Sequence, residues 1–328
     1  MRWGRLTTPG GNGAGDLRPD SVKDELSRRE LRRKRAAGRL PVPFIVGVNR
    51  SGTTLLRMML DAHPELAIPP ETHFVPDLIE LAHTPGVSPD ALTELVTAHR
   101  RWGDFGLGAE QLRERFATLD ELRPRLVVSA FFELYAEGQG KSRWGDKTPN
   151  YIKQIYAIQK VLPEARFIHV IRDGHDVALS IEERNPGESS MQRLAERWVR
   201  RIEWARRQRD QVDHYLEVRY EQLVLDPESV LRDVCGTIEI GYEPAMLEYY
   251  RRAPARLREL ARDLPAEGGR PGRAADERLA GHAMTASPPD RSRIGRWHHE
   301  MAEQDCADFE AVAGALLREL GYETREGR

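Results

Sequence analysis

The segment that most constrains the fold of this chain is residues 43–60, with the sequence PFIVGVNRSGTTLLRMML. It begins with a short apolar run rich in β-branched residues, which is typical of a buried parallel strand. A turn from Gly47 to Gly52 follows, and apolar residues at helical spacing from Leu55 to Leu60 then predict a helix. Backbone N–H groups in such a turn, together with the N-terminus of the helix, form an anion site. The segment therefore predicts a phosphate-binding strand, turn and helix.

The turn has the spacing G-x-x-x-x-G followed by two hydroxyl residues, which is the spacing of the nucleotide-triphosphate P-loop. Thr53 stands where that loop carries its lysine. Because this lysine neutralises the β- and γ-phosphates, its absence argues against an ordinary kinase or NTPase. Arg50 and the hydroxyls of Thr53 and Thr54 are further donors, so we expect a related phosphate ligand.

Two candidate bases follow a predicted short strand at residues 66–68, namely Glu71 and His73. Loops after the carboxyl ends of parallel strands line one crevice, so either side chain can face the phosphate loop. A carboxylate or an imidazole there can remove a proton from an acceptor hydroxyl. The alternative for Glu71 is a helix cap or a surface ion pair.

A candidate cation, Lys147, lies at a predicted strand-to-helix junction in the sequence RWGDKTPNYI. From this position it can neutralise charge that develops on a leaving phosphate, the role that Thr53 cannot fill. The alternative is a surface lysine paired with Asp146.

A second phosphate site is predicted by the sequence RFIHVIRDGHDVALSI, which again reads as strand, turn and helix. Arg172 ends the strand and Ser180 lies two helical turns into the helix, so both can reach one anion. The alternative is a purely structural Arg–Asp turn. Tyr220, at the end of a later predicted strand, either contacts the nucleotide or is a core aromatic residue.

In combination, these motifs resemble those of the sulfotransferase superfamily, which uses 3′-phosphoadenosine 5′-phosphosulfate (PAPS). The resemblance covers roughly residues 43–322 and is strongest to the tyrosylprotein sulfotransferases. It implies that the first loop holds the 5′-phosphosulfate, through Arg50, Ser51, Gly52, Thr53 and Thr54, with Asn49 in place of the proline of the superfamily motif. Arg172 and Ser180 match the motif for the 3′-phosphate, which ATP lacks.

The same resemblance implies catalytic roles. The segment AHPELAIPPETHFVP resembles A-H-P-(x)5-E-E-T-x-x-x-P, so Glu71 falls on the catalytic glutamate, with Pro70 in place of the preceding acid. Lys147 corresponds to a K-x-P lysine that, with Arg50, stabilises the transferring charge. Tyr220 lies in a shared Y-E-Q-L segment. The sequence DRSRIGRW resembles the segment that closes over the nucleotide, which makes Arg293 and Arg296 candidates for cofactor binding.

The fold expected is an α/β, P-loop-like three-layer fold with a central parallel sheet and helices on both faces. We expect one domain over residues 41–328, with a helical acceptor-side insertion at about 84–140 and a mobile loop at about 261–292. Residues 1–40 are arginine-rich and are expected to be a disordered or charged helical extension. The aromatic residues of the insertion either line an acceptor pocket or belong to the core.

The composition bears on partners and location. The formal net charge is −2, which argues mildly against nucleic acid, and no apolar run is long enough for a membrane span. The only cysteines, Cys235 and Cys306, form no paired metal-ligand pattern, so we expect no metal and a reducing cytoplasm. This location favours a small-molecule hydroxyl acceptor over a protein tyrosine. The sequence gives no indication of the oligomeric state.

The predicted reaction moves the sulfuryl group of PAPS in line to the acceptor hydroxyl, with a carboxylate base, and leaves adenosine 3′,5′-bisphosphate. Two alternatives remain open: a P-loop kinase that uses Mg-ATP, and a non-catalytic nucleotide-binding protein. The missing P-loop lysine and the second phosphate site count against the first. Intact Glu71 and Lys147 count against the second.

Overall fold

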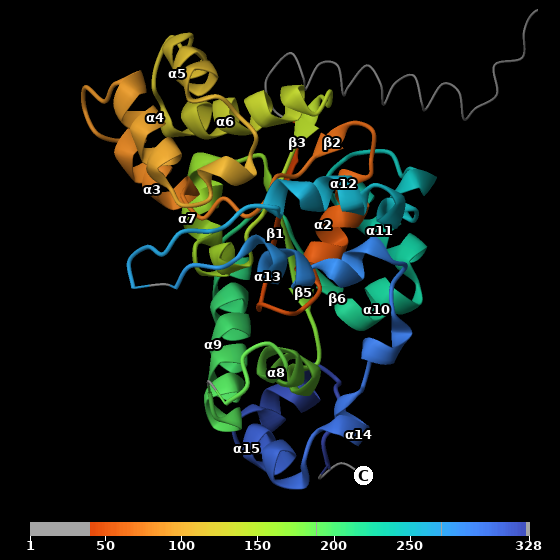
Figure 1. Cartoon of the computed structure of the whole chain (residues 1–328). Helices are drawn as coiled ribbons and strands as arrows, with labels where there is room; N and C mark the ends of the chain where they lie inside the picture. Colours follow the sequence, from red (N-terminus) through yellow and green to blue (C-terminus); the bar gives the residue numbers. More distant parts are fainter. Residues whose placement is uncertain (1–39, 188, 270, 326–328) are drawn as a thin grey trace, which may run out of the picture. The chain divides into compact units, whose positions relative to one another are not determined.

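The structure is a computed structural model and describes residues 40–187, 189–269 and 271–325. All of these except Leu40 belong to one compact unit, Pro41–Arg328. In Figure 1 the colours run along the chain from the N-terminus to the C-terminus. The predicted N-terminal extension lies outside the described residues. No helix in the described ranges combines the length and the apolar character needed to cross a bilayer.

The unit is built on a four-stranded parallel sheet. Its strands, in spatial order, are β4 (Asp146–Lys147), β1 (Val42–Gly47), β5 (Ala165–Ile171) and β6 (Tyr215–Arg219). Phe44 on β1 lies opposite Asp146 on one side and Phe167 on the other. Two further short strands, β2 (Leu66–Ala67) and β3 (Arg143–Trp144), pair in parallel beside this sheet. The predicted central parallel sheet is confirmed.

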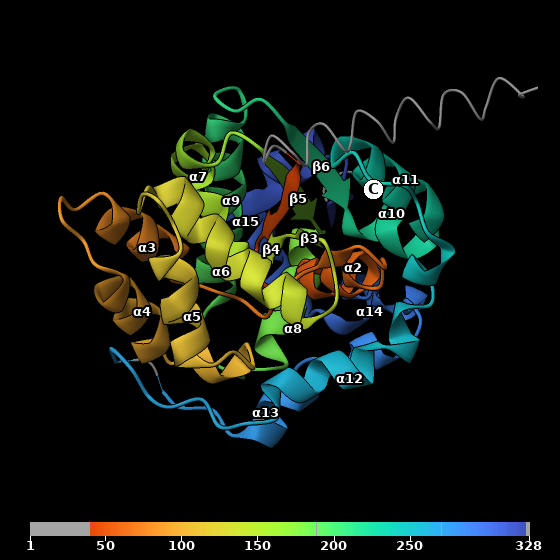
Figure 2. The ribbon, with the colours of Figure 1, turned by 90° about the horizontal axis from the view of Figure 1, so that it is seen from above.

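Both faces of the sheet are covered, which explains the uninterrupted apolar sequence of β1. Phe44 and Val46 point into one hydrophobic cluster, whereas Ile45 points into a second cluster on the opposite face. In the view from above, the strands lie between helices on both sides (Figure 2). One side carries α7 (Ile155–Val161) and α9 (Met191–Arg209); the other carries α2 (Thr53–Asp61), α10 (Tyr220–Leu225) and α11 (Pro227–Thr237).

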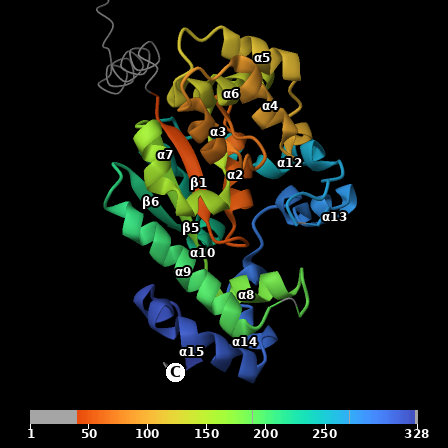
Figure 3. The same ribbon diagram turned by 90° about the vertical axis from the view of Figure 1, so that its left-hand side faces the viewer.

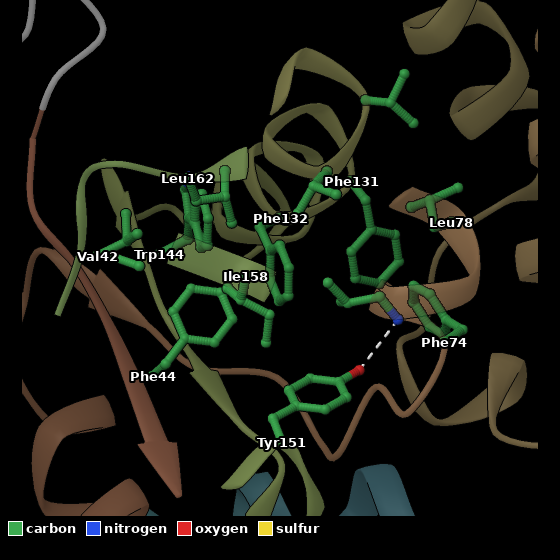
Figure 4. Close-up of a cluster of buried hydrophobic side chains, with 14 of the residues drawn as sticks. Val42, Phe44, Phe74, Leu78, Phe131, Phe132, Trp144, Tyr151, Ile158 and Leu162 are labelled. Atoms are coloured by element: carbon green, nitrogen blue, oxygen red, sulfur yellow. Dashed lines mark hydrogen bonds between the residues drawn. The ribbon is translucent and has the colours of Figure 1, made fainter. Parts of the chain in front are cut away.

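The predicted helical insertion forms much of the first cluster. It follows α3 (Val75–Ala82) and contains α4 (Pro89–Ala98), α5 (Ala109–Ala117) and α6 (Pro124–Gly138). Phe132 stacks on Trp144 with ring centroids 4.5 Å apart, and Phe131 meets Phe74 edge-on at 5.0 Å (Figure 4). Phe131 and Phe132 are fully buried, so these aromatic residues belong to the core.

A third cluster lies beyond the carboxyl end of the sheet. There α8 (Gly174–Glu182), α14 (Trp297–Glu300) and α15 (Glu303–Glu319) pack with α9, at the opposite end of the unit from α4 and α5 (Figures 1 and 3). Trp198 and Phe309 are fully buried between them. This packing fixes the first turn of α8, which follows Arg172 in the second predicted phosphate motif.

Two local predictions need correction or detail. The helix expected after Lys147 is a short 3-10 helix, η2 (Pro149–Lys153), because the sequence from Thr148 makes only a tight turn before α7. The long loop expected at 261–292 contains α13 (Ala275–Ala280), η6 (Ala283–Ala286) and part of η7 (Arg291–Arg293). The mobility of this loop stays a prediction. A short α12 (Ala253–Leu257) precedes it.

Candidate active site

The phosphate loop between β1 and α2 depends on two glycines. Gly52 has φ +91°, a left-handed conformation that side chains rarely adopt, and a Cβ atom there would lie 2.3 Å from Cδ2 of Tyr220. A Cβ atom on Gly47 would lie 2.7 Å from the carbonyl oxygen of Val170 on β5. The loop is therefore shaped by contact with both β5 and Tyr220.

The two predicted phosphate motifs meet at Arg50. Its Nε atom donates a hydrogen bond to Oγ of Ser180 at 3.0 Å, and its carbonyl oxygen accepts one from Arg172 at 3.2 Å. Burial, followed by the cations of Arg184 and Arg172, lowers the pKa of Arg50. This crowding of positive charge favours the binding of an anion between the side chains.

Arg172 is fixed by several contacts. Its guanidinium donates to the carbonyl oxygen of Arg293 at 2.6 Å and lies 4.5 Å from the centroid of the Tyr220 ring. Asp176, in the first turn of α8, lies 3.6 Å away. The Nε atom of Arg172 is buried and forms no hydrogen bond with the described residues. Arg172 thus connects the phosphate loop at Arg50 with the start of α10 and with the segment that contains Arg293.

A cavity of about 420 Å³ opens between these groups. All of the predicted cofactor-binding residues except Ser51 and Arg296 line it, namely Arg50, Gly52, Thr53, Thr54, Arg172, Ser180, Tyr220 and Arg293. Acidic side chains, those of Glu183, Glu277 and Asp290, also reach its wall, whereas Tyr249 and Met284 supply apolar surface. A cavity of this size with convergent polar groups and an apolar wall is typical of a small-molecule site.

Glu71 and Lys147 form an ion pair beside this cavity. Nζ of Lys147 donates to Oε1 of Glu71 at 2.7 Å and lies 3.5 Å from Oγ1 of Thr54, which lines the cavity. Oε2 of Glu71 accepts from Nε2 of His73 at 2.9 Å and lies 3.6 Å from Arg101. Lys147 is only 3% exposed and pairs with Glu71, so the alternative of a surface lysine paired with Asp146 is wrong.

The electrostatics of this pair keep the carboxylate ionised. Burial would raise the pKa of Glu71, but the Lys147 ammonium, with His73 and Arg101, outweighs burial and holds this pKa well below its usual range. Burial lowers the pKa of Lys147, and the Glu71 carboxylate opposes that change. The helix-cap alternative for Glu71 is also wrong, because the cap residue of α3 is Phe74.

A buried polar cluster holds the chain around Glu71. Oδ1 of Asp146 accepts hydrogen bonds from the hydroxyls of Thr72 at 2.8 Å and Thr148 at 3.2 Å. Tyr151 contacts the Thr72 hydroxyl at 2.8 Å and accepts from the Val75 amide. Burial raises the pKa of Asp146 to about 7, against the effect of these hydrogen bonds. The cluster ties the segment of Glu71 to the strand that carries Lys147.

Two predicted residues lie apart from the cavity. The Ser51 hydroxyl is fully buried and makes no hydrogen bond within the described part of the chain. The guanidinium of Arg296 is engaged by Glu183 and Glu300. Their predicted roles in cofactor binding stay untested.

Sequence reasoning missed several residues of the cavity wall, among them Arg184, His282 and Tyr249. Arg184 follows Ser180 by four residues, and this helical spacing could have indicated that both side chains face the same cavity. The Arg184 guanidinium packs against Gly281. His282 lines the cavity near the Glu71–Lys147 pair, and burial, followed by the Lys147 charge, lowers its pKa to about 3. Tyr249 donates to the Ser287 carbonyl at 2.6 Å. No local pattern marks His282 or Tyr249.

Comparison with solved structures agrees with the fold. The fold is similar to that of the sulfotransferase domain from the curacin biosynthetic pathway, with a TM-score of 0.59 and 22% sequence identity. The alignment covers 87% of this chain and 99% of that domain. At this identity the likeness bears on the fold alone.

Comparison with protein sequences identifies relatives over most of the unit. Protein-tyrosine sulfotransferase 1 of Danio rerio is 30% identical over 217 residues, which are 64% of this chain and 56% of that protein. Nodulation protein NoeE of Sinorhizobium fredii is 27% identical over 313 residues, which are 86% of this chain and 67% of that protein. The chain thus spans about half the length of its Danio rerio relative. The model of a family described as "Sulfotransferase family" matches residues 41–244, and the chain belongs to this family.

Proposed function

We propose that the protein transfers the sulfuryl group of PAPS to an acceptor hydroxyl, with a carboxylate as general base and no metal. The observation that carries the proposal is the position of the Glu71–Lys147 ion pair, 3.5 Å from Thr54 of the phosphate loop. A proton acceptor and a cation thus adjoin a cavity lined by arginines and hydroxyls.

The choice of donor is supported by the two linked phosphate motifs. PAPS carries a 5′-phosphosulfate and a 3′-phosphate, and the cavity offers basic and hydroxyl groups from the β1–α2 loop and α2, and from the turn after β5 and α8. Arg50 and Ser180, which we assign to the different phosphates, are hydrogen-bonded to each other. The apolar surface of Tyr249 and Met284 suits a nucleobase.

In the proposed reaction, Glu71 accepts the proton of the acceptor hydroxyl, whose oxygen attacks sulfur. The bond between sulfur and the bridging phosphate oxygen breaks in line with this attack, and adenosine 3′,5′-bisphosphate leaves. Lys147 and Arg50 stabilise the negative charge that develops between the phosphate and the sulfuryl group. His73 remains the alternative base, because its Nε2 atom is 2.9 Å from Glu71.

For the acceptor, the names of the relatives revise the expectation from the sequence. The small-molecule preference rested on a cytoplasmic location, which has not been tested. Relatives from Danio rerio and Drosophila melanogaster are named protein-tyrosine sulfotransferases. We therefore propose a tyrosyl hydroxyl of a peptide as the first acceptor to test, and a phenolic small molecule as the second.

The experiment is a transfer assay with PAPS labelled in the sulfuryl group, with and without added Mg²⁺. Tyrosyl peptides, the same peptides with phenylalanine in place of tyrosine, and small phenols are compared as acceptors. Label in the tyrosyl peptide alone, independent of added Mg²⁺ and lost in Glu71→Gln, is the expected result. Label in phenols alone would overturn the peptide assignment, and transfer that requires added Mg²⁺ would overturn the mechanism.

A further inference from the structure

A cluster of metal-ligand side chains lies between α8 and α15, in the third hydrophobic cluster. Nε2 of His175 is 3.1 Å from Oε1 of Glu310, and Sγ of Cys306 is 3.3 Å from the same oxygen. One donor atom from each residue lies within 4.8 Å of the others, and no second group of this kind occurs in the described ranges. His175 and Cys306 are buried, and Glu310 is nearly so.

The two contacts of Glu310 fit a shared coordination shell, and the donor atoms of His175 and Cys306 lie within 4.8 Å of each other. Zinc is bound by histidine nitrogen or carboxylate oxygen at about 2.0–2.2 Å and by thiolate sulfur at about 2.3 Å, so tetrahedral neighbours lie about 3.3–3.6 Å apart. The contacts of Glu310 with His175 and Cys306 are close to this range. A thiolate and a carboxylate together also cancel the charge of a divalent ion, which matters at a buried position.

The orientation of the His175 imidazole is fixed by contacts of its second nitrogen and of its ring face. Its Nδ1 atom is 2.8 Å from Oδ1 of Asp173, and its ring stacks on Trp297 with centroids 4.1 Å apart. Trp297 in turn donates its indole N–H to the second carboxylate oxygen of Asp173 at 3.2 Å. Histidines that bind metals commonly have such a carboxylate on the second nitrogen, because it fixes the tautomer and directs Nε2 at the ion.

Space for a fourth ligand is present. A cavity of about 360 Å³ adjoins the cluster and is lined by Trp297, His298, Met301, Glu303, Cys306 and Arg325. Of the three cluster residues, Cys306 lines this cavity. Three protein ligands with an open fourth position are an established zinc arrangement.

We propose that His175, Cys306 and Glu310 bind one Zn²⁺ ion, with water in the fourth position, in a site that fastens α15 to the start of α8. The first turn of α8 also carries Asp176, which accepts from the amides of Gly295 at 2.8 Å and Trp297 at 3.2 Å. The ion therefore stabilises the segment that precedes α14 and contributes Arg293 to the larger cavity. This inference does not depend on the proposed sulfuryl transfer.

The competing account is a hydrogen-bonded cluster without metal, in which the Cys306 thiol and the Arg325 amide donate to Glu310. Titration of the full chain with Co²⁺, after chelator treatment, separates the two accounts. One equivalent of Co²⁺, with a thiolate-to-cobalt charge-transfer band that Zn²⁺ abolishes, is expected. Absence of binding, or Co²⁺ binding without that band, would overturn the proposal.

Variants locate the site. Cys306→Ser should abolish the band, and Asp173→Asn should weaken Zn²⁺ binding by about 10–100-fold. Cys235→Ser is the matched control, because Cys235 is also buried but contacts Met246 in the second hydrophobic cluster. Zn²⁺ should also raise the unfolding temperature of the unmodified chain and of Cys235→Ser. A band that persists in Cys306→Ser overturns the assignment. If Cys306→Ser does not fold, Glu310→Gln takes its place, and unchanged Zn²⁺ affinity in that variant overturns it.

Discussion

Nζ of Lys147 lies 2.7 Å from Oε1 of Glu71, although 76 residues separate them in the chain. Glu71 follows β2, and Lys147 ends β4, the neighbour of β1 in the central sheet. The phosphate loop follows β1, so adjacent parallel strands bring the loop and the proposed cation together, and the proposed base joins them from the segment after β2 of the two-stranded sheet. The chemistry proposed here depends on this proximity.

Replacement of the proposed base tests its role. Glu71→Gln keeps the shape of the side chain but removes its charge, so kcat for sulfuryl transfer should fall by about 10²–10⁴-fold. Affinity for adenosine 3′,5′-bisphosphate should change little, since Glu71 does not line the larger cavity. His73→Gln is the matched variant and should retain most of the activity. A larger loss of kcat in His73→Gln than in Glu71→Gln, measured in a steady-state assay, would assign the role of base to His73.

The pH dependence follows from the depressed pKa of Glu71. Because Lys147 holds this pKa well below the usual value of about 4.3, Glu71 is ionised throughout pH 5–8 and kcat/KM should have no acid limb from it there. Lys147→Met removes the cation, so the pKa of Glu71 should rise and an acid limb should move toward neutral pH. An acid limb in the unmodified protein that disappears in His73→Gln would contradict this account.

The same shift affects stability. A carboxylate whose pKa is lower in the folded state stabilises the fold above its unfolded value, and this contribution is lost as the pH falls through the folded value. The unfolding temperature should therefore decline below pH 4.3 by a smaller amount in Glu71→Gln than in the unmodified protein. Thermal unfolding followed by circular dichroism at a series of pH values measures this difference; an identical decline would show that the Glu71 pair is not coupled to folding.

The phosphate loop should not tolerate a side chain at Gly52. Gly52→Ala places a methyl group against Tyr220 and keeps an unfavourable positive φ, which alone costs about 1–2 kcal/mol. Affinity for adenosine 3′,5′-bisphosphate should fall at least tenfold. The double variant with Tyr220→Ala should relieve the clash but not the backbone strain, so the affinity for the bisphosphate should recover only in part. Full affinity in Gly52→Ala would mean that the loop does not contact the ligand.

The Arg172 guanidinium should distinguish ligands that carry a 3′-phosphate from ligands that lack it. Arg172→Lys keeps the charge but loses the two carbonyl contacts and the stacking on Tyr220. With about 1.5–3 kcal/mol for a charged hydrogen bond, PAPS should bind about 10–150-fold more weakly. Adenosine 5′-phosphosulfate, which lacks the 3′-phosphate, should be affected much less. Equal losses for both nucleotides would place Arg172 elsewhere on the ligand.

Much of this arrangement could be predicted because it is local. The apolar runs of β1 and β5 and the turns after them identify two strand–turn–helix units, and the shared edge of a parallel sheet brings Arg50 near Arg172. The helix start at Asp226 was also predictable, since its side chain accepts from the Ser229 amide at 3.3 Å.

The remainder depends on side-chain pairs that are distant in the chain. Arg296 has the spacing of a ligand-binding residue but is engaged by Glu183, more than 100 residues earlier. His282 reaches the cavity only because η6 and its neighbours fold over α2. His175 and Cys306 are 131 residues apart, so no local spacing marks them as metal ligands. Such pairs follow from tertiary packing, which residue types and periodicity do not specify.

Calorimetric titration with adenosine 3′,5′-bisphosphate and with ATP, each with and without magnesium, distinguishes a PAPS site from an ATP site. Metal-independent binding of the bisphosphate with clear preference over ATP is expected, because Arg172 and Ser180 are proposed to bind a 3′-phosphate and Thr53 stands in place of the P-loop lysine. Preference for magnesium-ATP would contradict the proposed PAPS site.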